Sequence, residues 1–136
     1  MSLELGRENT LFIHLTLLPY IKVAGELKTK PTQHSVKELR GIGIQPDILI
    51  CRSEYPLEDS DRKKIALFTN VAENSVFMSL DKDTIYKVPE GLHGQGLDEV
   101  VVSNVGLKWD AADLSEWKGV ESRLGRPNHS VDGTMV

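Results

Sequence analysis

The sequence has a single cysteine, Cys51, so it can form no internal disulfide and no zinc site built from several cysteines. This scarcity is typical of a reducing compartment, and we expect a cytoplasmic location. No apolar run approaches the roughly 20 residues that a membrane span needs. The charged start, MSLELGREN, also lacks the apolar core of a signal peptide. We therefore expect no membrane partner.

The sequence also lacks a large excess of either charge. It has 16 basic and 20 acidic residues, for a formal net charge of -4. The lysines and arginines form no long stripe of the kind that tracks a nucleic-acid backbone, so we expect no nucleic-acid partner. Only 6% of the residues are aromatic, which leaves Ile, Leu and Val to build the core. With 136 residues, 40% of them hydrophobic and 26% charged, the composition indicates one globular domain.

Three short apolar runs predict β-strands. The run from Thr10 to Leu18 is nearly continuous and rich in β-branched residues, as expected of a strand buried on both faces. Two shorter runs, Asp47 to Cys51 and Ser75 to Leu80, predict two more strands. Helical patterns lie between them, over residues 31–43 and 58–70. This alternation predicts an α/β fold with a parallel sheet covered by helices on both faces.

The carboxyl ends of parallel strands are where ligands collect. We therefore look for chemistry in the polar stretches after Leu18, Cys51 and Leu80. Farther along, LSEWKGVESRL predicts a last amphipathic helix. The polar residues after it are typical of a linker, and the closing GTMV resembles the start of a further strand.

The most informative stretch, GELKTKPTQHSVKEL, places Lys28 and Lys30 two residues apart just before a helix. In an extended chain both side chains point to one side, roughly 6.6 Å apart. At an effective dielectric near 20 they repel by about 2 to 3 kcal/mol, which an anion between them would reverse. A helix entering at Pro31 or Thr32 adds free N–H groups that favour phosphate. The pattern indicates a polyphosphate site; the alternative is two solvated lysines.

The segment KTKPTQHSVKELRGIGIQPDILICRS is similar to the sequence that forms part of the UTP site in CTP synthases. The similarity extends through ELGRENTLFIHLTLLPY, RKKIALFTNV, DTIYKVPEGL and LSEWK, in the order of that family. These blocks are collinear and cover nearly the whole chain. The resemblance implies that the residues contacting UTP or CTP are Lys28, Thr29, Lys30, Pro31, Thr32, Gln33 and Lys64.

The resemblance also implies that the ATP base lies against the loop after the third strand, at Leu80, Asp81 and Lys82. The family usually has D-V-D-T-I-Y where this chain has DKDTIY, so Lys82 departs from the pattern. Lys64 has an alternative structural interpretation, because on a helix it can pair with Asp61, three residues before it, just as Lys63 can pair with Asp59.

The histidines and the cysteine, the other side chains that could act in catalysis or bind a metal, predict no catalytic centre in this chain. His34 follows the nucleotide-binding residues directly, but an early helix residue can simply be exposed. Cys51 ends an apolar strand, where a small buried thiol is the ordinary outcome. We expect His14 to be a hydrogen-bonded core residue, and His93 and His129 suggest no metal cluster.

In the family that this chain resembles, ATP phosphorylates the uracil carbonyl of UTP, and ammonia released from glutamine by a glutaminase domain displaces the phosphate. The implied parent is an ATP-dependent carbon–nitrogen ligase that uses Mg²⁺ and forms a homo-tetramer. This chain lacks a Gly-rich phosphate loop, the acidic magnesium site of the family and its G-G-T-V-G-D segment. We therefore expect the fragment to be inactive alone.

We interpret residues 1–126 as the carboxyl-terminal part of the synthetase, or amidoligase, domain, an incomplete P-loop-like unit. Residues 127–136 would be the linker toward a glutaminase domain. The expected small-molecule partners are UTP, CTP and ATP. Two alternatives stay open: a stand-alone regulatory nucleotide-binding module, and a small α/β scaffold that binds a partner.

Overall fold

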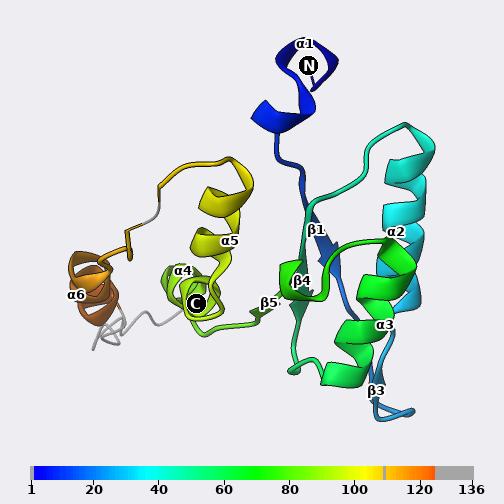
Figure 1. The fold of residues 1–136 in the computed structure, drawn as a ribbon. Helices are drawn as coiled ribbons and strands as arrows, with labels where there is room; N and C mark the ends of the chain where they lie inside the picture. The colour runs from blue at the N-terminus through cyan, green and yellow to red at the C-terminus, as the bar shows by residue number, and fades with distance from the viewer. Residues whose placement is uncertain (1, 109, 125–136) are drawn as a thin grey trace, which may run out of the picture.

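The structure, a computed structural model, describes residues 2–108 and 110–124. Strands alternate with helices along most of the chain, as the sequence predicts (Figure 1). The elements in chain order are α1 (Ser2–Leu5), η1 (Arg7–Asn9), β1 (Ile13–Leu17), β2 (Tyr20–Ile21), β3 (Glu26–Leu27), α2 (Lys30–Gly41), β4 (Ile48–Ser53), α3 (Asp59–Thr69), η2 (Glu73–Ser75), β5 (Val76–Leu80), η3 (Ile85–Lys87), α4 (Val88–His93), α5 (Leu97–Asn104) and α6 (Ser115–Leu124).

A three-stranded parallel sheet with the strand order β1-β4-β5 forms the centre of the fold. Its middle strand, β4, pairs Ile50 with Leu15 of β1 and with Phe77 of β5. Helices α2 and α3 lie on one side of the sheet, and α4 and α5 lie on the other (Figure 1). The three predicted strands are thus confirmed as mutually parallel, and so is the α/β class with helices around a parallel sheet.

The main hydrophobic core lies between the sheet and the helices α2 and α3. Val36 of α2 and Ile65 of α3 are 1% and 0% exposed, and they belong to one cluster with Leu49, Cys51 and Val76 of the strands. Fully burying an aliphatic side chain of this size stabilises a fold by about 1.5 to 3 kcal/mol. This cluster therefore fixes both helices against the sheet and sets the positions of their amino-terminal ends.

Strand β1 differs from the prediction that it is buried on both faces. His14 and Thr16 point toward α2, where they bond to helix residues, but Ile13, Leu15 and Leu17 are 46%, 65% and 59% exposed. The prediction was wrong because β1 is an edge strand of the described sheet, and α4 and α5 lie against the β5 side of the opposite face. One face of β1 is therefore apolar but not covered by other elements in the described part of the chain.

A side chain forms hydrogen bonds with the outer edge of β5, which pairs with no other strand in the described sheet. The Gln95 amide oxygen accepts a hydrogen bond from the Met78 N–H at 2.8 Å, and its nitrogen donates to the carbonyls of Met78 at 2.7 Å and Gly91 at 2.8 Å. Unpaired strand edges tend to recruit other chains, so this contact also protects the edge. It ties the end of α4 to the sheet beside the carboxyl end of β5.

The last described helix, α6, confirms the amphipathic helix predicted there. Its Trp117 donates from Nε1 to the Tyr86 carbonyl at 2.8 Å, and Lys118 lies 3.1 Å from Glu90 of α4. The linker and the strand predicted from GTMV lie outside the described residues. Within residues 2–108 and 110–124, no helix combines the length and the apolar character that crossing a membrane requires.

Candidate functional site

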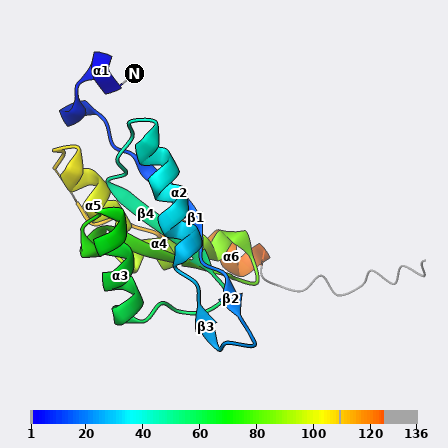
Figure 2. The same ribbon diagram turned by 90° about the vertical axis from the view of Figure 1, so that its right-hand side faces the viewer.

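Polar side chains gather beyond the carboxyl ends of the parallel strands, as the sequence predicts. The β2–β3 hairpin follows β1 and leads into the start of α2 (Figure 2). Arg52 and Ser53 end β4, and Asp81 follows β5 directly. The chain holds these ends together through backbone hydrogen bonds, from Leu18 N–H to the Arg52 carbonyl at 2.8 Å and from Asp81 N–H to the Ser53 carbonyl at 3.0 Å.

Two of the predicted UTP-binding residues, Lys28 and Lys64, influence the same carboxylate, that of Glu26. Lys28 donates from Nζ to Glu26 in an exposed ion pair. The hydrogen bond and the charge of Lys28 lower the pKa of Glu26, and the charge of Lys64 lowers it further. The charge of Lys64 thus acts on the carboxylate that Lys28 binds, 36 positions away from Lys28 in the sequence, and Lys64 forms no ion pair with Asp61 within the described residues.

Lys28 and Lys30 do not lie on one extended segment, so that part of the sequence argument was wrong. Helix α2 already begins at Lys30, and Thr29 before it has helical backbone angles of φ -82° and ψ -17°. Lys30 instead lines a groove along α2, whereas Lys28 stays beside Glu26. The alternation rule for strands fails here because the helix starts one or two residues earlier than predicted.

The neutral side chains of the same segment are engaged with the protein itself. Thr29 is buried and its hydroxyl accepts from Gln33 Nε2 at 3.0 Å. Thr32 is also buried, with its hydroxyl 2.5 Å from that of Thr16 and 3.2 Å from the Leu17 carbonyl, to which it donates. The bonds of Thr32 fasten the start of α2 to β1, and the bond between Thr29 and Gln33 lies within the first turn of the helix. No side chain caps this helix start, so its first N–H groups stay available to an anion.

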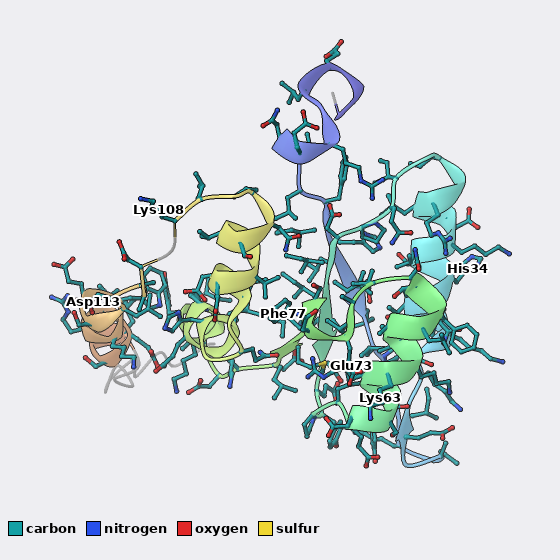
Figure 3. All side chains as sticks on the ribbon, viewed as in Figure 1. His34, Lys63, Glu73, Phe77, Lys108 and Asp113 are labelled. Carbon is teal, nitrogen blue, oxygen red and sulfur yellow. The ribbon has the colours of Figure 1, made fainter. Side chains whose placement is uncertain are left out.

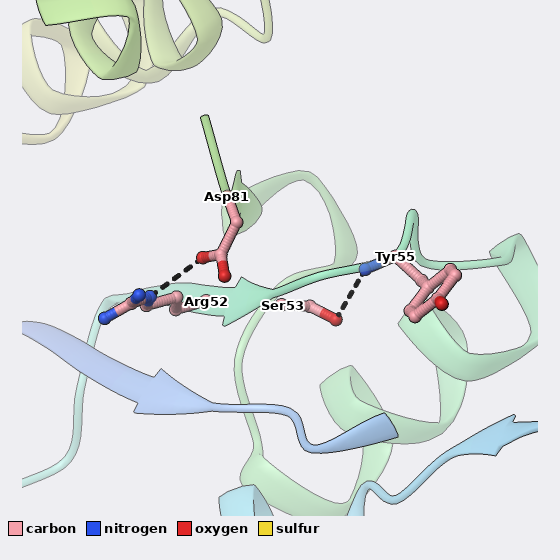
Figure 4. A network of polar contacts seen from close by, with 4 residues as sticks. All are labelled: Arg52, Ser53, Tyr55 and Asp81. Atoms are coloured by element: carbon pink, nitrogen blue, oxygen red, sulfur yellow. Dashed lines mark hydrogen bonds and ion pairs between the residues drawn. The ribbon is translucent and has the colours of Figure 1, made fainter. Parts of the chain in front are cut away.

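The predicted ATP-binding residues Leu80, Asp81 and Lys82 line one hollow of about 330 Å³ at the carboxyl end of β5. The hollow also contains Arg52, whose Nε donates to Asp81 Oδ1 at 2.9 Å (Figure 4). Sequence reasoning did not single out Arg52. Its position directly after Cys51, at the end of a predicted strand, is the signal that would have found it.

The other candidates behave as ordinary structural groups. His14 is half-buried with Nε2 2.8 Å from the Ser35 hydroxyl, which confirms a hydrogen-bonded histidine. His34 is exposed on the outer side of α2 and lies 3.9 Å from Glu38 (Figure 3). Cys51 is confirmed as buried, and burial raises the pKa of its thiol to about 11. His93 pairs with Asp98 at 2.7 Å, and His129 lies outside the described residues.

The fold and the site together define a parallel α/β protein whose charged groups collect beyond the carboxyl ends of its strands, the usual ligand-binding side of such sheets. The family model of the CTP synthase N-terminus matches residues 1–107 of the 136-residue chain. The chain therefore belongs to the CTP synthase family, which confirms the resemblance in its sequence. The family is one of ligases in pyrimidine biosynthesis, and membership supports a CTP synthase role.

Proposed function

We propose that this chain supplies the UTP- and CTP-binding segment of a CTP synthase, which makes CTP from UTP, ATP and glutamine or ammonia through a phosphorylated UTP. The observation that carries the proposal is the exposed ion pair of Lys28 with Glu26 just before the uncapped start of α2. Glu26 is an anion held by Lys28, and the charge of Lys64 also lowers its pKa; the family resemblance assigns both lysines to UTP. A phosphate group of the nucleotide would take the place of that carboxylate.

The rest of the segment would hold and orient the nucleotide. Lys30 and Pro31 open α2, so the uncapped first turn points its N–H groups and the positive end of the helix dipole toward the ligand. The hydrogen bonds of Thr29, Thr32 and Gln33 keep this helix start in place. We assign these three residues to the site because they position the helix start, in addition to any direct contact.

We assign the hollow at Leu80, Asp81 and Lys82 to part of the ATP site, with the base beside the loop after β5. Its apolar members can cover a base, while Arg52 and Lys82 provide positive charge. Magnesium would belong to other parts of the parent enzyme. Within the described residues no three His, Cys, Asp or Glu side chains gather as metal ligands do.

The complete reaction would require a parent ligase that adds a phosphate-binding loop, a magnesium site and a glutaminase domain, and that assembles as a homo-tetramer. We place this parent in the cytoplasm, because the single cysteine of this chain can form no internal disulfide, which is typical of a reducing compartment. The chain alone would bind nucleotide weakly and form no CTP from UTP, ATP and ammonia. CTP production by the purified chain would contradict this assignment.

The test is a calorimetric titration of the full chain with UTP and, separately, with uridine at low ionic strength. We expect the phosphates to account for most of the affinity, and added salt to weaken it. Lys28→Ala and Lys64→Ala should each weaken UTP binding. The matched control is Lys63→Ala, an exposed lysine on the same helix as Lys64 that lies outside the proposed site.

Glu26→Gln gives the sharper result, because it removes the carboxylate that competes with phosphate while leaving the lysines intact. An exposed ion pair of this kind contributes little, so UTP should bind only a few-fold more tightly, roughly 5-fold at most. If uridine binds as well as UTP, or Glu26→Gln weakens binding, then these lysines are ordinary surface residues.

A further inference from the structure

A pair of stacked tyrosines lies beyond the carboxyl ends of the strands, and the function proposed above does not use it. The rings of Tyr20, in β2, and Tyr55, after β4, have centroids 4.0 Å apart and planes inclined by 33°. Their contact joins the β2–β3 hairpin to the segment that runs from β4 to α3. Both segments lead to residues of the proposed UTP and CTP site, because Lys28 follows the hairpin and Lys64 lies on α3.

The hairpin is too short to hold its position by itself. Each of its strands has two residues, which pair Tyr20 with Leu27 and Ile21 with Glu26. A two-stranded hairpin in isolation is at best marginally stable in water. At its tip, Val23 is fully exposed. The hairpin therefore depends on contacts with the rest of the chain for its place beyond the sheet (Figure 2).

The register of the hairpin gives its two faces different tasks. Directly opposed residues of an antiparallel pair share a face, and successive residues alternate between faces. Tyr20 and Leu27 therefore share the inner face, where Leu27 packs against the hydrophobic core and Tyr20 contacts Tyr55. Glu26 lies on the outer face, in its ion pair with Lys28. Holding the inner face thus determines where this ion pair is presented.

Tyr55 is itself anchored to the sheet. Its N–H donates to the hydroxyl of Ser53 at 3.2 Å (Figure 4). Ser53 is 2% exposed and ends β4, which is the middle strand of the three-stranded sheet. The ring of Tyr55 is 41% exposed, whereas that of Tyr20 is half-buried. The stack therefore connects the hairpin to the central strand.

We propose that Tyr55 is a positioning residue for the nucleotide-binding segment, because its ring holds Tyr20 and thereby fixes the hairpin that carries Glu26 and leads to Lys28. This inference rests on the proposed function. The stack acts before the ligand arrives and without touching it, by keeping the hairpin in the position that binds the phosphates. Apparent affinity falls with the fraction of molecules in that position, and loss of an aromatic stack lowers this fraction by up to about tenfold.

The first measurement uses the full chain without ligand. Hydrogen exchange is followed at Lys28, whose N–H donates to the Pro19 carbonyl at 2.9 Å across the base of the hairpin. Tyr55→Leu removes the ring but keeps an apolar side chain, and should speed this exchange about two- to tenfold. Tyr55→Phe keeps the ring and should exchange as the parent does. Exchange at Met78 should stay unchanged in both variants, since a general loss of stability would speed it too. Unchanged exchange at Lys28 in Tyr55→Leu would overturn the proposal.

The second measurement is the affinity for UTP, by calorimetry at low ionic strength. Tyr55→Leu should weaken binding by up to about tenfold, and Tyr55→Phe should restore it. Tyr20→Leu should weaken binding as much, and the double variant no more than either single one, because both act through one contact. Additive losses would show that each ring touches the ligand itself, and would overturn the positioning role. The matched control is Tyr86→Leu, which removes a ring from the separate pair of Tyr86 with Trp117 and should leave UTP affinity unchanged.

The two measurements separate this inference from the proposed function. If the parent chain does not bind UTP, the proposed function fails, and exchange at Lys28 still decides whether the stack holds the hairpin. If the parent binds UTP and Tyr55→Leu binds it equally well, the proposed function stands and the positioning role is overturned. A merely structural role of the stack would lower the urea midpoint without changing the UTP affinity of the folded chain.

Discussion

Leu49 and Leu15 offer a direct test of which face of the sheet is the core. They lie on neighbouring parallel strands, β4 and β1, and both would be truncated to alanine, so the chemical change is identical. Leu49 is 0% exposed and packs in the core cluster below α2 and α3, whereas Leu15 is 65% exposed on the opposite face. The two substitutions therefore differ only in what surrounds the lost atoms.

The expected costs follow from these exposures. Truncating a fully buried leucine removes its burial and leaves a cavity, which together cost about 2 to 5 kcal/mol. Leu15 has only about a third of its surface covered, so its truncation should cost about 0.5 to 1 kcal/mol from a full burial value of about 1.5 to 3 kcal/mol. The difference between the two variants should thus exceed about 1 kcal/mol.

Urea unfolding followed by far-ultraviolet circular dichroism would measure both costs as shifts of the midpoint at unchanged slope. The titrations should be repeated over a range of protein concentrations, because association through the apolar face of β1 would bury Leu15. Equal costs at the lowest concentration would show that this face is covered within a single chain, and would refute the described arrangement of β1.

Two further outcomes are expected. The hydrogen bond from Lys118 lowers the pKa of Glu90 below its usual value of 4.5, so this contribution to the docking of α6 is present above pH 4.5 and is lost as the pH falls through the lowered pKa. In a Trp109→Phe background the fluorescence of Trp117 should therefore shift to the red in acid, and less so when Glu90→Gln is added. Gln95→Ala should destabilise the chain by about 0.5 to 1.5 kcal/mol, because it removes the hydrogen bonds of a partly solvated side chain to the β5 edge, and should speed hydrogen exchange at Met78. Unchanged exchange at Met78 would show that water replaces the side chain.

The sequence predicted the order and type of the main elements because apolar periodicity is a local property. The runs ending at Cys51 and Leu80 became adjacent parallel strands, since short buried strands joined by helices have few other ways to pair. Leu15 was misjudged for a different reason. Whether a face of an apolar strand is covered depends on which helices reach it, and the residues of the strand do not contain that information.

The candidate site was predictable in location but not in geometry. The carboxyl-end rule identified the stretches that contain Lys28, Asp81 and Lys82, whereas a shift of the helix start to Lys30 was enough to separate the two lysines. The ion pair between Arg52 and Asp81 joins residues 29 positions apart, and only the register of β4 against β5 brings them together. Such contacts cannot be deduced from spacing along the chain.

The ion pairs of the site also bear on how a nucleotide would bind. Lys28 holds a carboxylate of the chain itself, Glu26, where phosphate is proposed to bind, and Arg52 holds Asp81 in the hollow assigned to part of the ATP site. Both pairs are exposed, and exposed ion pairs contribute little because water screens them, so a nucleotide can displace them at small cost. Until it does, the carboxylates offset the repulsion that clustered cations would otherwise cause. Phosphate binding then becomes an exchange of one anion for another, which predicts modest affinity, strong dependence on salt, and a gain in affinity when Glu26 loses its charge.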